Sequence, residues 1–105
     1  MSLAHQPAHL IVLDTGQSIP LNATQMLVGR QDPRVGIYPE VNLQHKTLNR
    51  VHAKLRSHNG SYTVEDLNSI NKTRLNGVIL IPGQEYALHN GDLLVFGSVK
   101  VRFEQ

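Results

Sequence analysis

The stretch HAKLRSHNGSYTVED, residues 52–66, decides the fold. Apolar and polar side chains alternate on both sides of its Asn59-Gly60 pair, and this period of two is typical of β-strands with one buried face. Asn-Gly also tolerates the positive φ angles of a tight turn, so the stretch predicts an antiparallel hairpin. Its first strand should turn Ala53 and Leu55 toward the core. The opposite face should carry the polar residues His52, Lys54 and Arg56.

Similar short runs recur along the chain, and no window keeps the spacing of an amphipathic helix over three turns. We expect strands at residues 9–13, 18–21, 25–29, 41–43, 52–57, 62–66, 74–75, 78–80, 85–87, 92–96 and 99–103. Residues 31–40 are expected to form one long irregular connection, and Asn76-Gly77 and Asn90-Gly91 to form turns. About eleven short strands are too many for one flat sheet, so we predict an all-β, two-sheet antiparallel β-sandwich with loops at its ends.

Length and composition indicate one domain. We expect residues 9–105 to form it and residues 1–8 to be disordered or left over from cloning, because they lack the basic and apolar regions of a signal peptide. The absence of cysteine excludes disulfides and suits the cytoplasm, where we expect the protein. No apolar run approaches the roughly 20 residues needed to span a bilayer, so no membrane partner is expected.

Charge is distributed unevenly along the chain. The formal net charge is +2, but residues 30–74 hold eight Lys or Arg against four Asp or Glu, a local balance of +4. This balance favours an acidic or phosphorylated partner, and the alternative is a solvated basic face without a ligand.

Short polar motifs in the expected loops have the chemistry of an anion site. They are Gly29-Arg30, Asn49-Arg50-Val51-His52, the run DLNSINKT at residues 66–73, and Asn76-Gly77. Arg30 and Arg50 carry planar donors of fixed charge that meet phosphate oxygens two at a time. The amides of Asn49 and Asn71 add neutral hydrogen bonds. Alternatively, Arg30 pairs with Asp32 or Glu40, Arg50 lies along the sheet surface, and the asparagines serve loop geometry.

Catalysis and metal binding are not expected. The six histidines are scattered, with no close set of metal ligands, and no serine has a recognisable nucleophile setting. A nucleotide-binding G-x-x-x-x-G-K-S/T loop is absent from the sequence. We therefore expect neither an enzyme nor a cofactor.

The order and spacing of the polar motifs, followed by Gly91-Asp92 and Gly97, resemble the forkhead-associated (FHA) domain over residues 9–105. This family is a phosphothreonine-peptide-binding β-sandwich. The segment from Gly29 to Glu40 is similar to bacterial, particularly cyanobacterial, members. The resemblance implies a partner that carries phosphothreonine and an upstream Ser/Thr kinase.

The resemblance also implies residue roles. Arg30 would contact the phosphate, Asn49 would take the place of a serine that also binds it, and Arg50 would reach the phosphate or the peptide main chain. Asn71 would hold the peptide backbone. Ile70 lies where the family selects the residue three places after the phosphothreonine, and its aliphatic side chain suggests an apolar contact.

Four residues would support the site: Gly29, His52, Asn76 and Gly77. His52 would act as a hydrogen-bonding buttress under the loops. The chain departs from the family pattern twice, with Asn49 in place of serine and Lys72 in place of glycine. Asn49 keeps a donor but is bulkier. Lys72 is strained if its loop position needs a positive φ.

The predicted function is that of a phosphothreonine-dependent protein-binding module. The two departures leave open a phosphate-independent interaction or assembly domain with the same fold. Nucleic-acid binding by the basic middle region is not expected, because no aromatic side chains are interleaved with the basic loops as a stacking platform.

Overall fold

The computed structural model describes residues 7–105, which form eleven β-strands and one short 3-10 helix. The strands are β1 (His9–Val12), β2 (Ser18–Pro20), β3 (Gln25–Gly29), β4 (Val41–Asn42), β5 (Ala53–His58), β6 (Ser61–Asp66), β7 (Thr73–Leu75), β8 (Val78–Ile79), β9 (Glu85–Leu88), β10 (Leu93–Phe96) and β11 (Val99–Glu104). The 3-10 helix η1 (Pro33–Val35) lies in the connection expected to be irregular. Every strand boundary lies within one residue of the expectation, which confirms the all-β prediction.

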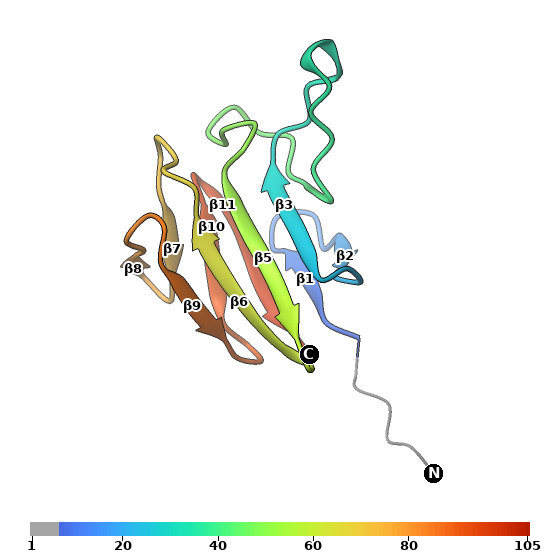
Figure 1. The fold of residues 1–105 in the computed structure, drawn as a ribbon, viewed down its shortest axis with the longest axis vertical. Coiled ribbons are helices and arrows are strands. Elements are labelled where there is room, and N and C mark those ends of the chain that lie inside the picture. The colour runs from blue at the N-terminus through green and yellow to red at the C-terminus, as the bar shows by residue number, and fades with distance from the viewer. Residues whose placement is uncertain (1–6) are drawn as a thin grey trace.

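Two sheets pack face to face (Figure 1). The strand order is β2-β1-β11-β10-β7-β8 in the six-stranded sheet and β4-β3-β5-β6-β9 in the five-stranded sheet. The pair β3 and β4 is parallel, with Val28 opposite Val41, whereas the sequence predicted antiparallel pairing throughout. A strand of two residues carries no pattern from which its direction could be derived.

The hairpin at residues 52–66 forms as predicted. Asn59 and Gly60 have φ angles of 51° and 82°, and His58 lies opposite Ser61. Asn76-Gly77 also has two positive φ angles and joins β7 to β8. At Asn90-Gly91 only the glycine does.

The core lies between the sheets. Ala53 and Leu55 are buried as predicted, and Phe96 and Phe103 contribute the largest core side chains. His52 is also fully buried, so its predicted place on the outer face is wrong. β5 begins at Ala53, and the alternation of a strand does not extend to the loop residue before it.

The loops that follow β3, precede β5 and join β6 to β7 gather at the upper end of the sandwich in Figure 1, where the β3–β4 connection projects furthest. The C-terminus lies at the lower end. Of residues 1–8, which we expected to lie outside the domain, the first six are outside the described residues. Ala8 is buried and its carbonyl oxygen accepts the N–H of Leu21 at 2.9 Å.

Candidate functional site

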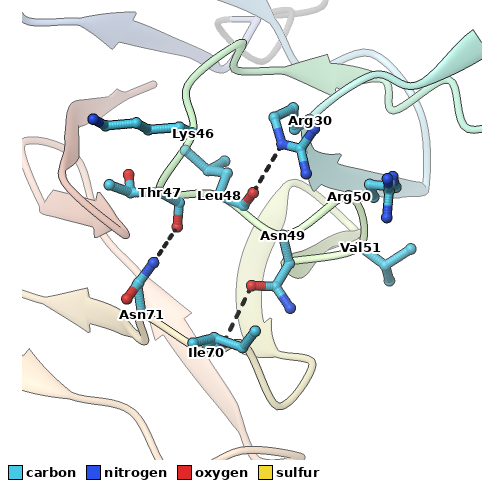
Figure 2. A pocket seen from close by; sticks show the side chains of 9 residues that line it. All are labelled: Arg30, Lys46, Thr47, Leu48, Asn49, Arg50, Val51, Ile70 and Asn71. Carbon is cyan, nitrogen blue, oxygen red and sulfur yellow. Dashed lines mark hydrogen bonds between the residues drawn. The ribbon is translucent and has the colours of Figure 1, made fainter.

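A hollow of about 340 Å³ opens among the gathered loops (Figure 2). It is lined by Arg30, Lys46, Thr47, Leu48, Asn49, Arg50, Val51, Ile70 and Asn71. All five residues predicted to contact a ligand are therefore brought together. Sequence reasoning missed Lys46, Thr47 and Leu48, which belong to none of the motifs. None of the four predicted supporting residues, Gly29, His52, Asn76 and Gly77, lines the hollow.

Arg30 and Arg50 are each held by the Nε nitrogen. The Nε–H of Arg30 donates to the carbonyl oxygen of Leu48 at 3.1 Å, and that of Arg50 donates to Oδ2 of Asp32 at 2.6 Å. Among the described residues, neither guanidinium makes another hydrogen bond within the protein. Each one therefore keeps the four N–H donors of its terminal amino groups.

The expected alternative, in which Arg30 pairs with Asp32 or Glu40, is not what the structure contains. Asp32 pairs with Arg34 and Arg50, and Glu40 accepts the N–H of Leu27 at 2.7 Å. The hydrogen bonds from Arg34 and then from Arg50 hold the pKa of the Asp32 carboxyl well below its usual range.

Gly29 lets the two arginines lie on adjoining segments. A Cβ atom at Gly29 would lie 1.9 Å from the carbonyl oxygen of Arg50, so a side chain there would overlap the backbone. The N–H of Arg30 donates to the carbonyl oxygen of Asn49 at 3.1 Å. The end of β3 is thus in direct contact with the loop that carries Asn49 and Arg50.

His52 connects two loops from beneath. Its Nδ1 accepts the N–H of Asn49 at 3.1 Å, and its Nε2 lies 3.0 Å from the carbonyl oxygen of Lys72, to which it donates. One ring nitrogen accepts and the other donates, which describes a neutral imidazole. Burial lowers the pKa of His52, outweighing the Lys72 carbonyl and the charge of Asp66, which raise it. This is the geometry of a buttress.

A buried carboxylate shapes the loop between β6 and β7. Asp66 accepts hydrogen bonds from the hydroxyl and the N–H of Ser69 at 2.5 and 3.1 Å, and from the hydroxyl of Thr73 at 2.6 Å. All three residues are buried. The network holds both ends of the loop that presents Ile70 and Asn71.

The two asparagines also tie loops together (Figure 2). Oδ1 of Asn49 accepts the N–H of Ile70 at 3.2 Å, and Nδ2 of Asn71 donates to the carbonyl oxygen of Thr47 at 2.9 Å. An N–H requires an oxygen acceptor and a carbonyl requires an N–H donor, so both amide orientations are fixed. Asn49 keeps its Nδ2 donor, and Asn71 keeps its Oδ1 acceptor.

Lys72, which stands where the family pattern has glycine, adopts the left-handed backbone conformation that favours glycine. Its φ angle is 70°. Its carbonyl oxygen accepts from His52 and from the N–H of Gly97 at 3.0 Å, and these bonds hold the strained backbone in place.

Neither a cluster of metal-ligating side chains nor a membrane-spanning helix occurs in residues 7–105. No group of three or more His, Asp or Glu in this part of the chain is placed to hold a metal ion. None of its helices is long and apolar enough to cross a membrane.

The family model described as the FHA domain matches residues 26–97. The chain therefore belongs to the FHA domain family, which confirms the resemblance. It is 30% identical over 95 residues to protein FraH of Nostoc sp. (strain PCC 7120), a match that covers 87% of this chain and 33% of FraH. The chain thus spans about a third of the length of this relative. A Nostoc relative fits the resemblance to cyanobacterial members.

Solved structures share the fold. The FHA domain of an Arabidopsis thaliana hypothetical protein has a TM-score of 0.83 at 23% identity, with 99% of this chain and 90% of that chain covered. An FHA domain from a structural and functional analysis of phosphothreonine-dependent FHA domain interactions has a TM-score of 0.82 at 24% identity, with 95% and 97% covered. Mycobacterium tuberculosis EmbR, in complex with a low-affinity phosphopeptide, has a TM-score of 0.81 at 21% identity, with 93% and 24% covered.

Replacing Lys72 by glycine should stabilise the domain. A side chain in the left-handed region costs about 1–2 kcal/mol, and glycine removes this cost at the expense of a more flexible unfolded chain, so we expect a net gain of about 1 kcal/mol. Urea unfolding measures it. The matched control Lys100→Gly, in the exposed part of β11, should lose about 0.5–1 kcal/mol. A lower free energy of unfolding for Lys72→Gly than for wild type would contradict the claim that the backbone of Lys72 is strained.

The buried imidazole should make stability depend on pH. The unfolded chain binds a proton at His52 near the ordinary pKa of 6.5, whereas burial lowers the pKa in the folded state. The contribution of His52 is therefore complete above pH 6.5 and falls as the pH drops from 6.5 toward the lowered pKa, by at most about 1.4 kcal/mol per pH unit. Urea unfolding between about pH 7.5 and pH 5 should show a shallower dependence for His52→Gln. Parallel curves would refute the role of His52.

Proposed function

We propose that this domain binds phosphothreonine in an extended segment of a partner protein, with the phosphate between Arg30 and Arg50. One observation carries the proposal. Both guanidinium groups are anchored through Nε, their terminal amino groups make no bond within the described residues, and both side chains line the same hollow. Phosphate oxygens accept paired N–H bonds from such groups. The phosphopeptide complex of the structurally similar EmbR is consistent with this use of the fold.

The charges of the hollow favour a dianion. Its lining includes three basic residues, Arg30, Arg50 and Lys46, although the amino group of Lys46 points away from the two arginines (Figure 2), and none of the lining residues is acidic. A phosphothreonine carries a charge of about −1.5 to −2 at neutral pH. Each charge-assisted hydrogen bond contributes about 1.5–3 kcal/mol, so two arginines supply most of the affinity. A Ser/Thr kinase acting on the partner would then control binding.

The loops beside the phosphate would read the peptide. The Oδ1 atom of Asn71 is an acceptor suited to a peptide N–H. Ile70 is 78% exposed and Val51 is 42% exposed, and both line the hollow. Binding is favoured when a ligand's apolar group covers such exposed apolar side chains, because apolar surface is removed from water. We therefore expect an apolar residue close after the phosphothreonine.

The departures from the family pattern do not favour the phosphate-independent alternative. Lys72 keeps a φ angle of 70°, and Asn49 keeps a free Nδ2 donor. The hollow remains open and basic despite both replacements.

Truncating Arg30 should abolish most binding while leaving the fold intact. Losing one partner of a hydrogen-bonded charge pair costs about 2–5 kcal/mol, at least about thirtyfold in affinity. Calorimetric titration with a phosphothreonine peptide chosen from a degenerate library measures the loss for Arg30→Ala. The unphosphorylated twin peptide should not bind wild type.

Arg102 supplies a matched control, because it is exposed on β11 of the six-stranded sheet. Arg102→Ala removes the same charge and should bind like wild type. Equal losses in the two variants would indicate general charge attraction. Equal binding of the phosphorylated and unphosphorylated peptides would support the phosphate-independent alternative.

Asn49→Ser tests whether the family's usual residue suits this chain. Serine is too short to keep the bond to the N–H of Ile70, so the β6–β7 loop loses one hydrogen bond to the loop before β5. The serine hydroxyl would still offer the phosphate a donor. A net hydrogen bond contributes about 1 kcal/mol, so we expect about fivefold weaker binding by calorimetry. Stronger binding would mean that Asn49 is an inferior phosphate contact.

A further inference from the structure

A buried carboxylate, that of Asp32, binds one of the arginines that line the hollow and lies on a loop that is otherwise largely exposed. Asp32 is 3% exposed, whereas its neighbours Pro33, Arg34 and Val35 are all exposed. A buried carboxylate requires partners that satisfy its oxygens and its charge. Two arginines satisfy those of Asp32.

Asp32 binds two arginines from separate segments. On its own loop, Arg34 donates from Nε to Oδ1 at 3.0 Å and from a terminal nitrogen to Oδ2 at 3.1 Å. Across the site, Arg50 donates from Nε to Oδ2 at 2.6 Å. The carboxylate therefore joins the β3–β4 connection to the loop before β5.

Asp32 is itself held rigidly by the backbone of its loop. Its N–H donates to the carbonyl oxygen of Ile37 at 3.0 Å, and its carbonyl oxygen accepts the N–H of Ile37 at the same distance. Its Oδ1 also accepts the N–H of Arg34 at 3.2 Å, at the start of η1. Gly36, with a φ angle of 71°, ends η1 and lets the chain return. These backbone bonds hold the Asp32 carboxylate in one position relative to its loop.

Arg34 and Arg50 donate different N–H groups to Asp32. Arg34 gives Asp32 both Nε and a terminal nitrogen, and its side chain is 81% exposed. Arg50 gives only Nε, keeps both terminal amino groups, is 46% exposed and lines the hollow. Arg34 balances the charge of Asp32, so the charge of Arg50 remains available to a ligand.

We propose that Asp32 is a positioning residue for phosphate recognition. Its bond to Nε holds the Arg50 side chain in one rotamer, in which the terminal amino groups can donate to the phosphate. This inference rests on the proposed function. A long arginine side chain that is ordered before binding loses less conformational freedom on binding. The opposite effect, in which Asp32 competes with phosphate for Arg50, predicts tighter binding when the carboxylate is removed.

The first test needs no ligand. Side-chain 15N relaxation should show Nε of Arg50 nearly as rigid as the backbone in the wild-type domain, and Nε of exposed Arg102 mobile. In Asp32→Asn, Arg50 should become mobile while Arg30, held by Leu48, stays rigid. A mobile Arg50 in the wild type would overturn the proposal, even if the variant failed to fold.

The second test measures affinity for a library-selected phosphothreonine peptide by calorimetry. Asp32→Asn should weaken binding about three- to tenfold. In an Arg50→Ala background the same change should alter affinity less than about twofold, because Asp32 acts through Arg50. The control Asp14→Asn, in an exposed turn, removes the same charge and should bind like wild type.

The outcomes separate the two claims. Unchanged or tighter binding by Asp32→Asn would overturn the positioning role, as would an equal loss in the Arg50→Ala background, which would indicate a purely structural residue. A wild-type domain with a rigid Arg50 that binds no phosphothreonine peptide would instead refute the proposed function, and with it the part of Arg50 in recognition.

Discussion

The candidate site depends on one buried, neutral imidazole. His52 accepts the N–H of Asn49 on one side and donates to the carbonyl oxygen of Lys72 on the other, and its ring packs edge-on against Phe96 of the core. The loop before β5 and the β6–β7 loop are therefore joined through this side chain to each other and to the core, and the amides of Asn49 and Asn71 add two more bonds between them. Protonation would remove the acceptor, and burial opposes it.

The two arginines are also held by few internal hydrogen bonds. A guanidinium has five donors, and Arg30 and Arg50 each use one, Nε, for an internal acceptor. Close contact at Gly29 brings their backbones together, where any Cβ atom would overlap Arg50. The charges are thus oriented by the fold before a ligand arrives, which reduces the entropy that binding must overcome.

Local patterns allowed most of the fold to be predicted. Alternation and Asn-Gly turns placed the strands, because both reflect short-range rules of side-chain direction and positive φ. They could not place His52, which precedes its strand, or the direction of two-residue β4. These features are decided by contacts between distant segments.

The sequence predicted several of the residues that line the hollow, but not the hydrogen bonds that hold the two arginines. Family spacing identified Arg30, Asn49 and Asn71, and all three line the hollow. The tie between Arg50 and Asp32 joins residues 18 positions apart and belongs to no motif, so only the folded chain shows it. Lys46 also lines the hollow and belongs to no motif.

A crystal structure of the domain with a bound phosphothreonine peptide would test the central claim, that the arginines are oriented before binding, most directly. We predict phosphate oxygens within hydrogen-bond distance of the terminal nitrogens of both Arg30 and Arg50. The bonds from their Nε atoms to Leu48 and Asp32 should remain in place. A phosphate bound elsewhere, or an Arg50 that leaves Asp32 to reach it, would contradict the account.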